Sequence, residues 1–358
     1  MAEAASFGRP SLAGRAIDMT FVIPAWRAGA TIADAIDSAL AQDGLEVEVV
    51  VVDDASPEGP PPAAIDHPSG RVRLVRRERN GGPGAARNDG FAVAQGRWIA
   101  VLDADDTVRP ERGRRMIEAA EATGSRVVVD NLLVNDSPVN DGSVNGARVR
   151  PMFAPAAWAR RGPLGLAEFV RSNTLFDRRF NHGYLKPVFA RSLVEEAGLR
   201  YDPALRIGED FLFLAEALAH GPAAIAPLAG YGYGVREGSI SRVLRLDHVR
   251  AMQSGDRRLQ ARLEASAPHA AESADAVAAF ARRARSLDRA AVFLRIVQAI
   301  KERRWNEASR LAFRHPSAAR LLAMPVGVRV KRWGGRTARA AARTLHPLAA
   351  RLRPLAAR

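Results

Sequence analysis

Short apolar runs alternate with amphipathic segments along the first 135 residues of the chain. Each run is too short for a helix and ends at Pro, Gly or Asp, which is typical of a buried strand. In the segment 31–42, Ile32, Ile36 and Ala39 fall on one helical face and Thr31 is placed to cap the helix. The pattern predicts strands at 19–24, 46–52, 71–75, 98–102 and 126–134 and helices at 31–42, 83–95 and 112–122. Strands that alternate with helices predict an open, mostly parallel α/β sheet whose ligands gather at the carboxyl ends of the strands.

Beyond residue 135 strands and helices no longer alternate regularly, and the composition of the chain changes twice. Residues 135–146 are rich in Asn, Asp, Ser and Gly, which predicts a loop. From about residue 246 the chain is rich in Ala and Arg at helical spacing. Helices are predicted at 164–172, 191–197, 209–218, 276–285 and 290–301, and strands at 184–189 and 225–233. We therefore divide the chain into a disordered lead-in (1–16), two α/β halves (17–135 and 136–243), a helical region (244–320) and a tail (321–358).

Three carboxylates stand directly after the predicted buried strand 98–102. Asp103, Asp105 and Asp106 would repel one another there, and such crowding is unfavourable unless a cation neutralises it. Oxygen ligands of this kind suit Mg²⁺ or Mn²⁺, especially when phosphate oxygens complete the coordination shell. The alternative is an acidic turn that caps the helix after Pro110.

Two other predicted strands end in residues suited to ligand binding. Pro24-Ala25-Trp26 follows the first strand, and Asp53-Asp54 follows the second. The carboxylates of the aspartates can accept from a base N–H, and an ordinary Asx-type turn is the alternative. Trp26 would either stack on a base or pack against its neighbours. Both sites belong to the same edge of the predicted sheet.

The stretch Asn80 to Asn88 is rich in glycine and leads into a helix. It fits a dinucleotide-binding fingerprint poorly, because Pro83 interrupts the turn and the third glycine is absent. A loop that opens a helix still suits the approach of phosphate, since the first N–H groups of the helix have no partner within it.

Five motifs follow one another in a fixed order along the chain. They are Val22-Ile23-Pro24, Val51-Val52-Asp53-Asp54-Ala55-Ser56, Asn80-Gly-Gly-Pro-Gly-Ala-Ala-Arg87-Asn88, Leu102-Asp103-Ala104-Asp105-Asp106 and Gly208-Glu209-Asp210. The series resembles the family 2 inverting glycosyltransferases of GT-A fold, a Rossmann-like mixed, mostly parallel sheet flanked by helices. The later stretch Tyr231 to Ser241 is similar to bacterial members that build exopolysaccharides such as succinoglycan. The resemblance covers about residues 19–242.

The resemblance implies a sugar transfer with inversion from a nucleotide-sugar, with a UDP-sugar expected as the donor. The acceptor would be a saccharide, with a polyprenyl-linked oligosaccharide expected, and the cofactor would be Mn²⁺ or Mg²⁺. Residues 17–135 would then bind the nucleotide-sugar, and residues 136–243 would hold the acceptor side and the catalytic base.

The resemblance also assigns roles to individual residues. The nucleotide-sugar would contact Pro24, Ala25, Asp53, Asp54, Arg87 and Ala104. Asp103 and Asp105 match the metal-binding pair, with Asp105 as the direct ligand, and Asp106 would cap the turn or orient a neighbour. Asp210 matches the general base, although acidic residues at a helix N-terminus are also favourable without any catalytic role. Glu209, Arg236 and Ser239 would contact the acceptor or close over the diphosphate, and His182 is an ordinary loop histidine or an acceptor contact.

Two other classes of function compete with this interpretation. A nucleotidyltransferase on a similar fold would require a Gly-rich phosphate loop with a Lys after the first strand, which Pro24 to Gly29 does not supply. A non-catalytic module that binds sugar nucleotides would not need the intact Asp105 and Asp210.

Composition adds an expectation about location. The chain carries a net charge of +14 and has no cysteine, which excludes disulfides and thiolate metal sites and fits a reducing compartment. Residues 321–358 hold nine Lys or Arg and no Asp or Glu. We expect a cytoplasmic protein whose basic amphipathic tail attaches it to anionic lipid on the inner face of the plasma membrane. A packed or disordered arm, and an Arg and Ala bias of the coding sequence, are the alternatives; nucleic acid is not an expected partner, because no recognition motif accompanies the charge.

Overall fold

The computed structural model divides the chain into two compact units. Unit 1 comprises residues 1–172 and 179–236, and unit 2 comprises residues 173–178 and 237–358. The structure describes residues 16–65, 67–135, 149–176, 181–234, 244–266 and 271–323. Most of the predicted lead-in and tail, the predicted loop 136–146, Arg236 and Ser239 therefore lie outside the described residues.

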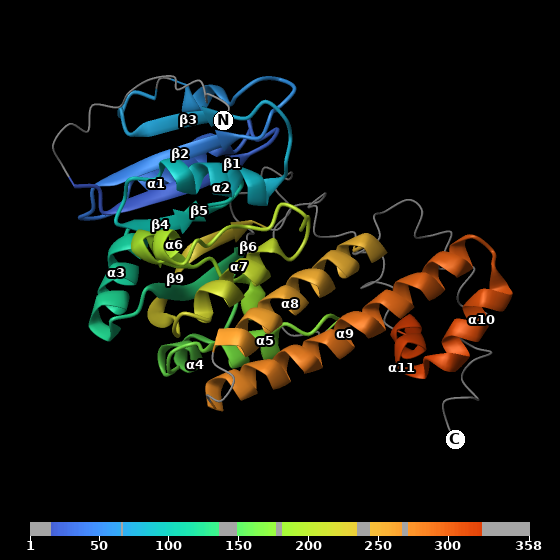
Figure 1. Ribbon diagram of the computed structural model, residues 1–358. Helices are drawn as coiled ribbons and strands as arrows, with labels where there is room; N and C mark the ends of the chain where they lie inside the picture. The colour runs from blue at the N-terminus through green and yellow to red at the C-terminus, as the bar shows by residue number, and fades with distance from the viewer. Residues whose placement is uncertain are drawn as a thin grey trace. The chain divides into compact units, whose positions relative to one another are not determined.

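A mixed sheet forms the middle of unit 1 (Figure 1). Within the described residues its strands are β1 (Met19–Ala25), β2 (Val47–Asp53), β3 (Val72–Arg76), β4 (Trp98–Val101), β5 (Thr107–Val108), β6 (Val127–Asn135), β7 (Val149–Pro151), β8 (Val188–Ala190) and β9 (Ala224–Gly234). The strand order is β3-β2-β1-β4-β8-β6-β9-β5, and β7 pairs with β6. Strands β1 to β4 are mutually parallel, as the sequence predicts, so their carboxyl ends meet at one edge.

The register of the parallel strands places the predicted motifs side by side. Ala25 at the end of β1 pairs with Asp53 at the end of β2, and Asp54 N donates to Ala25 O at 2.8 Å. Every residue of β2 is buried, in agreement with its nearly continuous run of valines.

Helices cover the sheet of unit 1. They are α1 (Ile32–Leu40), α2 (Pro83–Val93), α3 (Arg112–Thr123), α4 (Pro155–Ala159), α5 (Leu166–Ser172), α6 (Arg191–Glu196) and α7 (Glu209–Leu218), with 3₁₀ turns at Pro62–Ala64 and His182–Tyr184. Helix α2 approaches β1 closely, because a Cβ at Gly90 would lie 2.3 Å from Val22 Cγ1. Glycine at this position therefore allows the helix to pack on the sheet.

Several local predictions are wrong in detail. Thr31 stands at the N-cap of α1, but its side chain makes no capping bond and donates to Ala104 O at 2.8 Å instead. Of the predicted strand 184–189, only Val188 and Phe189 belong to a strand, β8. Tyr184 is part of a 3₁₀ turn, and Pro187, which has no N–H to donate, directly precedes β8. The short strands β5 and β7 were not predicted, since their pairing with β9 and β6 rather than their sequence defines them.

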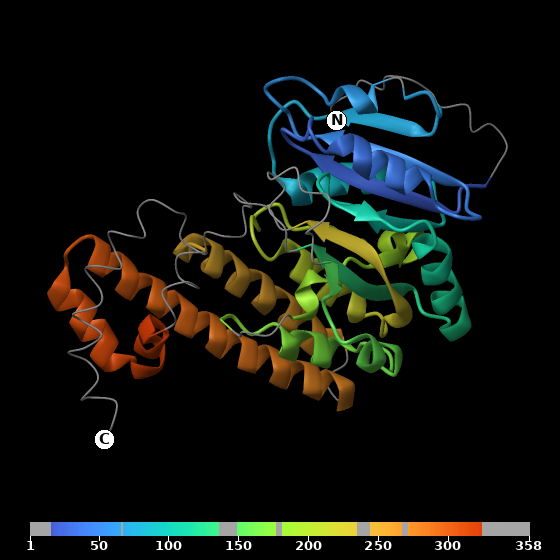
Figure 2. The same cartoon turned by 180° about the vertical axis from the view of Figure 1, so that it is seen from behind.

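Unit 2 is helical. Its helices are α8 (Leu246–Ser266), α9 (Ala271–Lys301), α10 (Trp305–Arg314) and α11 (Pro316–Ala319), followed by a 3₁₀ turn at Arg320–Ala323. Helices α8 and α9 run side by side in both views (Figures 1 and 2). The two helices predicted within 276–301 are one continuous helix, α9, whose Phe293, Ile296 and Ile300 form a core with Ala308 of α10. None of the helices in the described residues has the length and apolar character needed to cross a bilayer.

Candidate active site

The carboxyl edge of the sheet in unit 1 gathers a network of buried charges. Arg87 comes from α2, Asp103 follows β4, Lys186 precedes β8, and Glu209 with Asp210 opens α7. Segments separated by up to 123 positions in the sequence meet here, since Arg87 Nη1 donates to Asp210 Oδ1 at 2.6 Å. The structure thus brings together Arg87, Asp103, Glu209 and Asp210, four of the residues singled out in the sequence.

Asp103 is held between two cations. Its Oδ2 accepts from Lys186 Nζ at 2.6 Å and its Oδ1 from Arg87 Nη2 at 2.8 Å. Burial disfavours the ionised carboxylate, but these two cations outweigh it and lower the pKa of Asp103 well below its usual range. Burial likewise disfavours the Lys186 ammonium, yet Asp103 and Asp210 raise its pKa. Both groups are therefore charged over the whole physiological range.

Asp210 is the more open end of the same network. Arg87 lies at its Oδ1, and Lys186 Nζ lies 3.4 Å from its Oδ2. Its side chain remains 30% exposed, whereas that of Arg87 is 4% exposed. The neighbouring Glu209 accepts from Arg87 at 3.3 Å, and burial together with Asp210 raises the pKa of Glu209 to about 7. Both oxygens of Asp210 thus face cations while its side chain stays partly exposed, and a positioned carboxylate that is accessible is suited to accept a proton.

The start of α7 requires a glycine. Gly208 has φ of +88° in the left-handed region and directly precedes Glu209. No side chain caps this end of the helix, so the two acidic residues of its first turn face the positive end of the helix dipole.

An aromatic platform supports Arg87. The guanidinium lies 5.1 Å from the centroid of the Tyr201 ring, which stacks on Phe213 at 4.2 Å. Asn88 ties the same segment to α2, because its side chain both donates to Tyr201 O and accepts from Tyr201 N at 2.8 Å. The Arg87-Asn88 pair of the glycine-rich motif therefore positions the site rather than lying on the surface.

A second anchor holds the loop that follows β4. Asp106 is buried and accepts from Tyr231 Oη and from Gly234 N, each at 2.8 Å. Tyr231 Oη in turn accepts from Asp103 N at 3.1 Å. Through Tyr231 of β9, Asp106 thus fixes the backbone of Asp103. Burial, followed by the charge of Asp103, raises the pKa of Asp106 to about 7.

The tandem aspartates after β2 have different environments. Asp54 accepts from Gly81 N at 2.9 Å, from Gly82 N at 2.7 Å and from Arg77 Nη1 at 2.5 Å, so it holds the glycine-rich loop. Asp53 is fully buried; its Oδ1 accepts from Ser56 N at 3.2 Å, and its Oδ2 has no hydrogen-bond partner in the described part of the chain. The Arg76 Nε atom lies 3.5 Å from this oxygen. Of the two, Asp53 is the carboxylate with an unused acceptor.

The described residues would supply only part of the coordination shell of a metal ion. Among the residues that the structure describes, no three His, Cys, Asp or Glu side chains are grouped so as to hold a metal. Both oxygens of Asp103 accept from cationic side chains, so it fits a direct ligand poorly. Asp105 lies on the same loop and is exposed, which fits the one or two protein carboxylates that Mg²⁺ takes when phosphates supply the remaining ligands.

The other residues singled out in the sequence differ in how deeply they are buried. Pro24 and Ala25 end β1 beside Asp53. Trp26 is 46% exposed, with the Arg27 guanidinium 4.7 Å from its ring centroid, so it is not a core residue. His182 is buried against Phe153 rather than placed in an open loop, and burial lowers its pKa to about 4.

The sequence interpretation missed Lys186, Tyr201 and Tyr231. A signal existed for Lys186, since it interrupts the apolar run 184–189 next to Pro187. The tyrosines were not given roles: Tyr201 lies in none of the motifs, and Tyr231 only opens the stretch 231–241.

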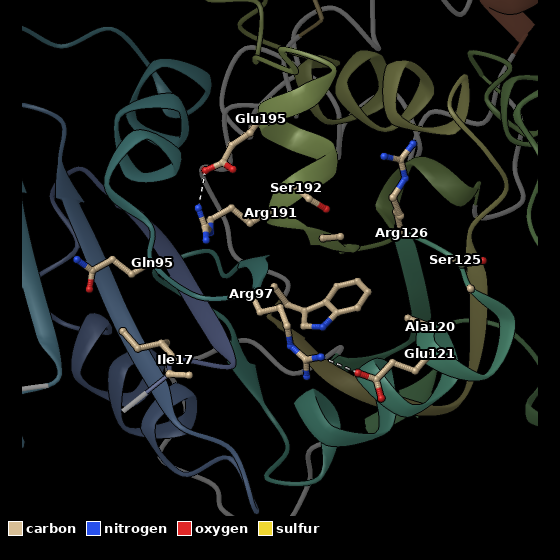
Figure 3. A pocket seen from close by; sticks show the side chains of 14 residues that line it. Ile17, Gln95, Arg97, Ala120, Glu121, Ser125, Arg126, Arg191, Ser192 and Glu195 are labelled. Carbon is tan, nitrogen blue, oxygen red and sulfur yellow. Dashed lines mark hydrogen bonds and ion pairs between the residues drawn. The ribbon is translucent and has the colours of Figure 1, made fainter. Parts of the chain in front are cut away.

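A separate pocket of about 560 Å³ lies at the opposite edge of the sheet (Figure 3). It is lined by Ile17 and Trp98, where β1 and β4 begin, so it is far from their carboxyl ends. The side chains there form matched ion pairs, Arg97 with Glu121 at 3.0 Å and Arg191 with Glu195 at 2.6 Å. It therefore lacks the convergent carboxylates of the carboxyl edge.

Comparison with known proteins identifies the family of the chain. The model of the family described as Glycosyl transferase family 2 matches residues 20–189. The chain is 48% identical to the succinoglycan biosynthesis protein ExoO of Rhizobium meliloti over 320 residues, 89% of this chain and 88% of that protein. It is 35% identical to the succinoglycan biosynthesis protein ExoU of the same organism over 68% of this chain and 70% of that one.

Solved structures share the fold. S. aureus TarS 1-349 in complex with UDP matches with a TM-score of 0.56 at 20% identity, covering 87% of this chain and 82% of that chain. The complex of TarS 1-349 with UDP-GlcNAc matches with a TM-score of 0.54 at 19% identity, covering 75% and 72%. A longer TarS chain is covered to 43% of its length. The family resemblance and the fold predicted from the motifs are confirmed.

Proposed function

Since this chain belongs to glycosyl transferase family 2, we propose that it transfers a sugar, with inversion, from a UDP-sugar to a saccharide acceptor in exopolysaccharide synthesis. The observation that carries the proposal is the placement of Asp210. Its carboxylate is fixed by Arg87 and Lys186 at the carboxyl edge of the sheet, and it remains partly open to solvent.

The proposed reaction is a single displacement. Asp210 takes the proton of the acceptor hydroxyl, the hydroxyl oxygen forms a bond to the anomeric carbon, and the bond from that carbon to the diphosphate oxygen breaks on the opposite face. The products are the glycosylated acceptor and UDP, with the proton left on Asp210. General-base catalysis of this kind is worth about 10²–10⁴ in rate.

The donor would occupy the ends of β1 and β2. The unused Oδ2 of Asp53 is an acceptor for the imide N–H of uracil, and it is buried, so that a missing partner would be unfavourable. The complexes of TarS with UDP and with UDP-GlcNAc support this donor class. Pro24 and Ala25 at the end of β1, and Ala104 after β4, would also contact the nucleotide-sugar, as the family resemblance implies.

The diphosphate would meet Arg87 and Lys186, the two cations of the site. Mg²⁺ or Mn²⁺ held by Asp105 would supply further positive charge against the departing diphosphate. Asp103 would act through its hold on Lys186 and Arg87 rather than as a direct metal ligand, since both its oxygens are engaged. The proposed acceptor is a polyprenyl-linked oligosaccharide; the names of ExoO and ExoU, both succinoglycan biosynthesis proteins, support a role in making a saccharide.

The test is a transfer assay with the purified full chain. UDP release and sugar transfer are measured for a panel of UDP-sugars with Mg²⁺, Mn²⁺ or a chelator. The Asp210→Asn variant should bind UDP as the wild type does and lose about 10²–10⁴ in kcat. Glu118→Gln, an exposed carboxylate on α3, is the matched control and should keep full activity. Undiminished transfer by Asp210→Asn would contradict the assignment of the base, and equal turnover with a chelator would contradict the metal.

A further inference from the structure

A groove of about 650 Å³ lies in unit 2 where α9 ends and α10 begins. Its lining includes five arginines and a tryptophan, with a single acidic residue, Glu307. The arginines are Arg295, Arg303, Arg304, Arg310 and Arg314. Such a concentration of one charge is unfavourable in the absence of an anion, since like charges at close range repel.

Most of this charge is unmatched. Arg304 pairs with Glu302 at 2.5 Å and also with Glu307. Across the described ranges of the chain, the other four arginines take part in no ion pair. The groove therefore has an excess of guanidinium groups, which present forked donors that suit phosphate oxygens.

The backbone at the end of α9 is strained at Arg303, one of the residues that line the groove. Arg303 has φ of +59°, in the left-handed region where glycine is the usual residue after a helix. Arg303 N donates to Ile300 O at 3.1 Å and Arg304 N to Ala299 O at 2.8 Å, which closes the helix end. An arginine retained at this position costs conformational free energy, and such outliers point to a functional constraint.

The outer face of α10 combines these cations with exposed aromatic side chains. Ala308 is buried against α9, and Leu311 packs on the same cluster, so they define the inner face. Phe313 is 85% exposed and shares the opposite face with Arg310, three residues earlier. Trp305 is 39% exposed at the start of the helix. Arginines beside exposed aromatic residues are the composition of a helix that lies in a membrane interface.

We propose that the α9–α10 groove binds the phosphate headgroups of anionic lipids, with Phe313 entering the boundary with the acyl chains. A soluble phosphate would satisfy the arginines but would leave Phe313 in water. The groove residues precede the predicted basic tail in the sequence, and the proposal does not depend on the proposed reaction. The hypotheses of a lipid-binding groove, a lipid-binding tail and a sugar transfer can therefore be disproved separately.

The test uses the full chain and sedimentation with vesicles of phosphatidylcholine alone or mixed equally with phosphatidylglycerol. The groove variant R303Q/R310Q/R314Q should bind the anionic vesicles on the order of a hundredfold more weakly, since each cation near such a surface contributes. Its control is R250Q/R282Q/R285Q, which removes the same charge from exposed positions on α8 and α9 and should weaken binding by no more than about threefold. The tail is intact in both proteins, so the difference isolates the groove.

Phe313→Ser tests the lipid contact without a change of charge. It should weaken binding to the anionic vesicles severalfold and leave binding of inorganic pyrophosphate unchanged. Equal losses in the two triple variants would overturn the proposal. So would a groove variant that keeps vesicle binding and loses binding of pyrophosphate or of a single-stranded oligonucleotide, because the occupant would then be a soluble phosphate or a nucleic acid.

Discussion

Two charged regions of this protein differ in how their cations are paired. In the carboxyl-edge network of unit 1, Arg87 and Lys186 are buried and each contacts at least two carboxylates. In the α9–α10 groove of unit 2, exposed arginines gather beside one acidic residue. The first arrangement fixes the positions of its carboxylates, whereas the second leaves cations available for an external anion. The difference shows that the partners of a charged residue, and not its type, indicate its role.

Lys186→Met should show the strongest effect, because it breaks the matched network. It leaves Asp103 Oδ2 without its 2.6 Å partner, and loss of one member of a buried ion pair costs about 3–5 kcal/mol. We expect a large fall in the urea midpoint of unit 1 and a loss of sugar transfer. Lys301→Met, an exposed lysine at the end of α9, is the control and should change neither. A Lys186→Met protein as stable as the wild type would mean that the network does not depend on this cation.

The pH dependence of stability tests the same network with a smaller expected effect. The pKa of Glu209 rises from its usual value near 4.5 to about 7 in the folded protein, through burial and Asp210. A raised folded pKa means that the unfolded chain releases the proton first, so this group lowers stability as pH rises from about 4.5 to 7. The contribution is up to about 3 kcal/mol.

Glu209→Gln removes this titration. Its free energy of unfolding, measured by urea denaturation at several pH values, should change less between pH 5 and 7 than that of the wild type. Identical pH profiles for the two proteins would show that Glu209 is not protonated in the folded network.

Arg310→Gln should have the smallest effect on stability. The side chain is exposed, and substitutions at such positions lie within about 0.5 kcal/mol. Thermal unfolding of the variant should match the wild type even though its contribution to the groove is lost. A marked destabilisation would show that the groove arginines support the fold, and the comparison between the two regions would then fail.

Much of unit 1 could be predicted because its strands are short apolar runs closed by Pro and Asp. The bounds of β1, β2 and β4 agree with prediction to within a residue at each end, since a parallel sheet buried on both faces leaves a clear apolar pattern. Asp53, Arg87, Asp103 and Asp210 were selected from motifs, and the topology places the last three in contact.

The roles of individual partners depended on the tertiary structure. The sequence offered Asp53 and Asp54 as equivalent, and only the contacts of Gly81 and Gly82 with Asp54 separate them. Lys186 lies 83 positions from Asp103 and joined no motif. The hydrophobic pattern of a segment indicates which face of a helix or strand is buried. It does not indicate which side chains from distant segments will contact that face.

The sequence alone therefore determined the class of fold, the edge of the sheet where the motif residues gather, and the family of the protein. Periodicity and strand endings are local properties, and they survive in the sequence without coordinates. Only the tertiary structure decided that Asp103 is held by two cations and that, within the described residues, four of the five arginines of the α9–α10 groove form no ion pair. Charge pairing is set by contacts between segments far apart in the chain, and those contacts exist only once the chain has folded.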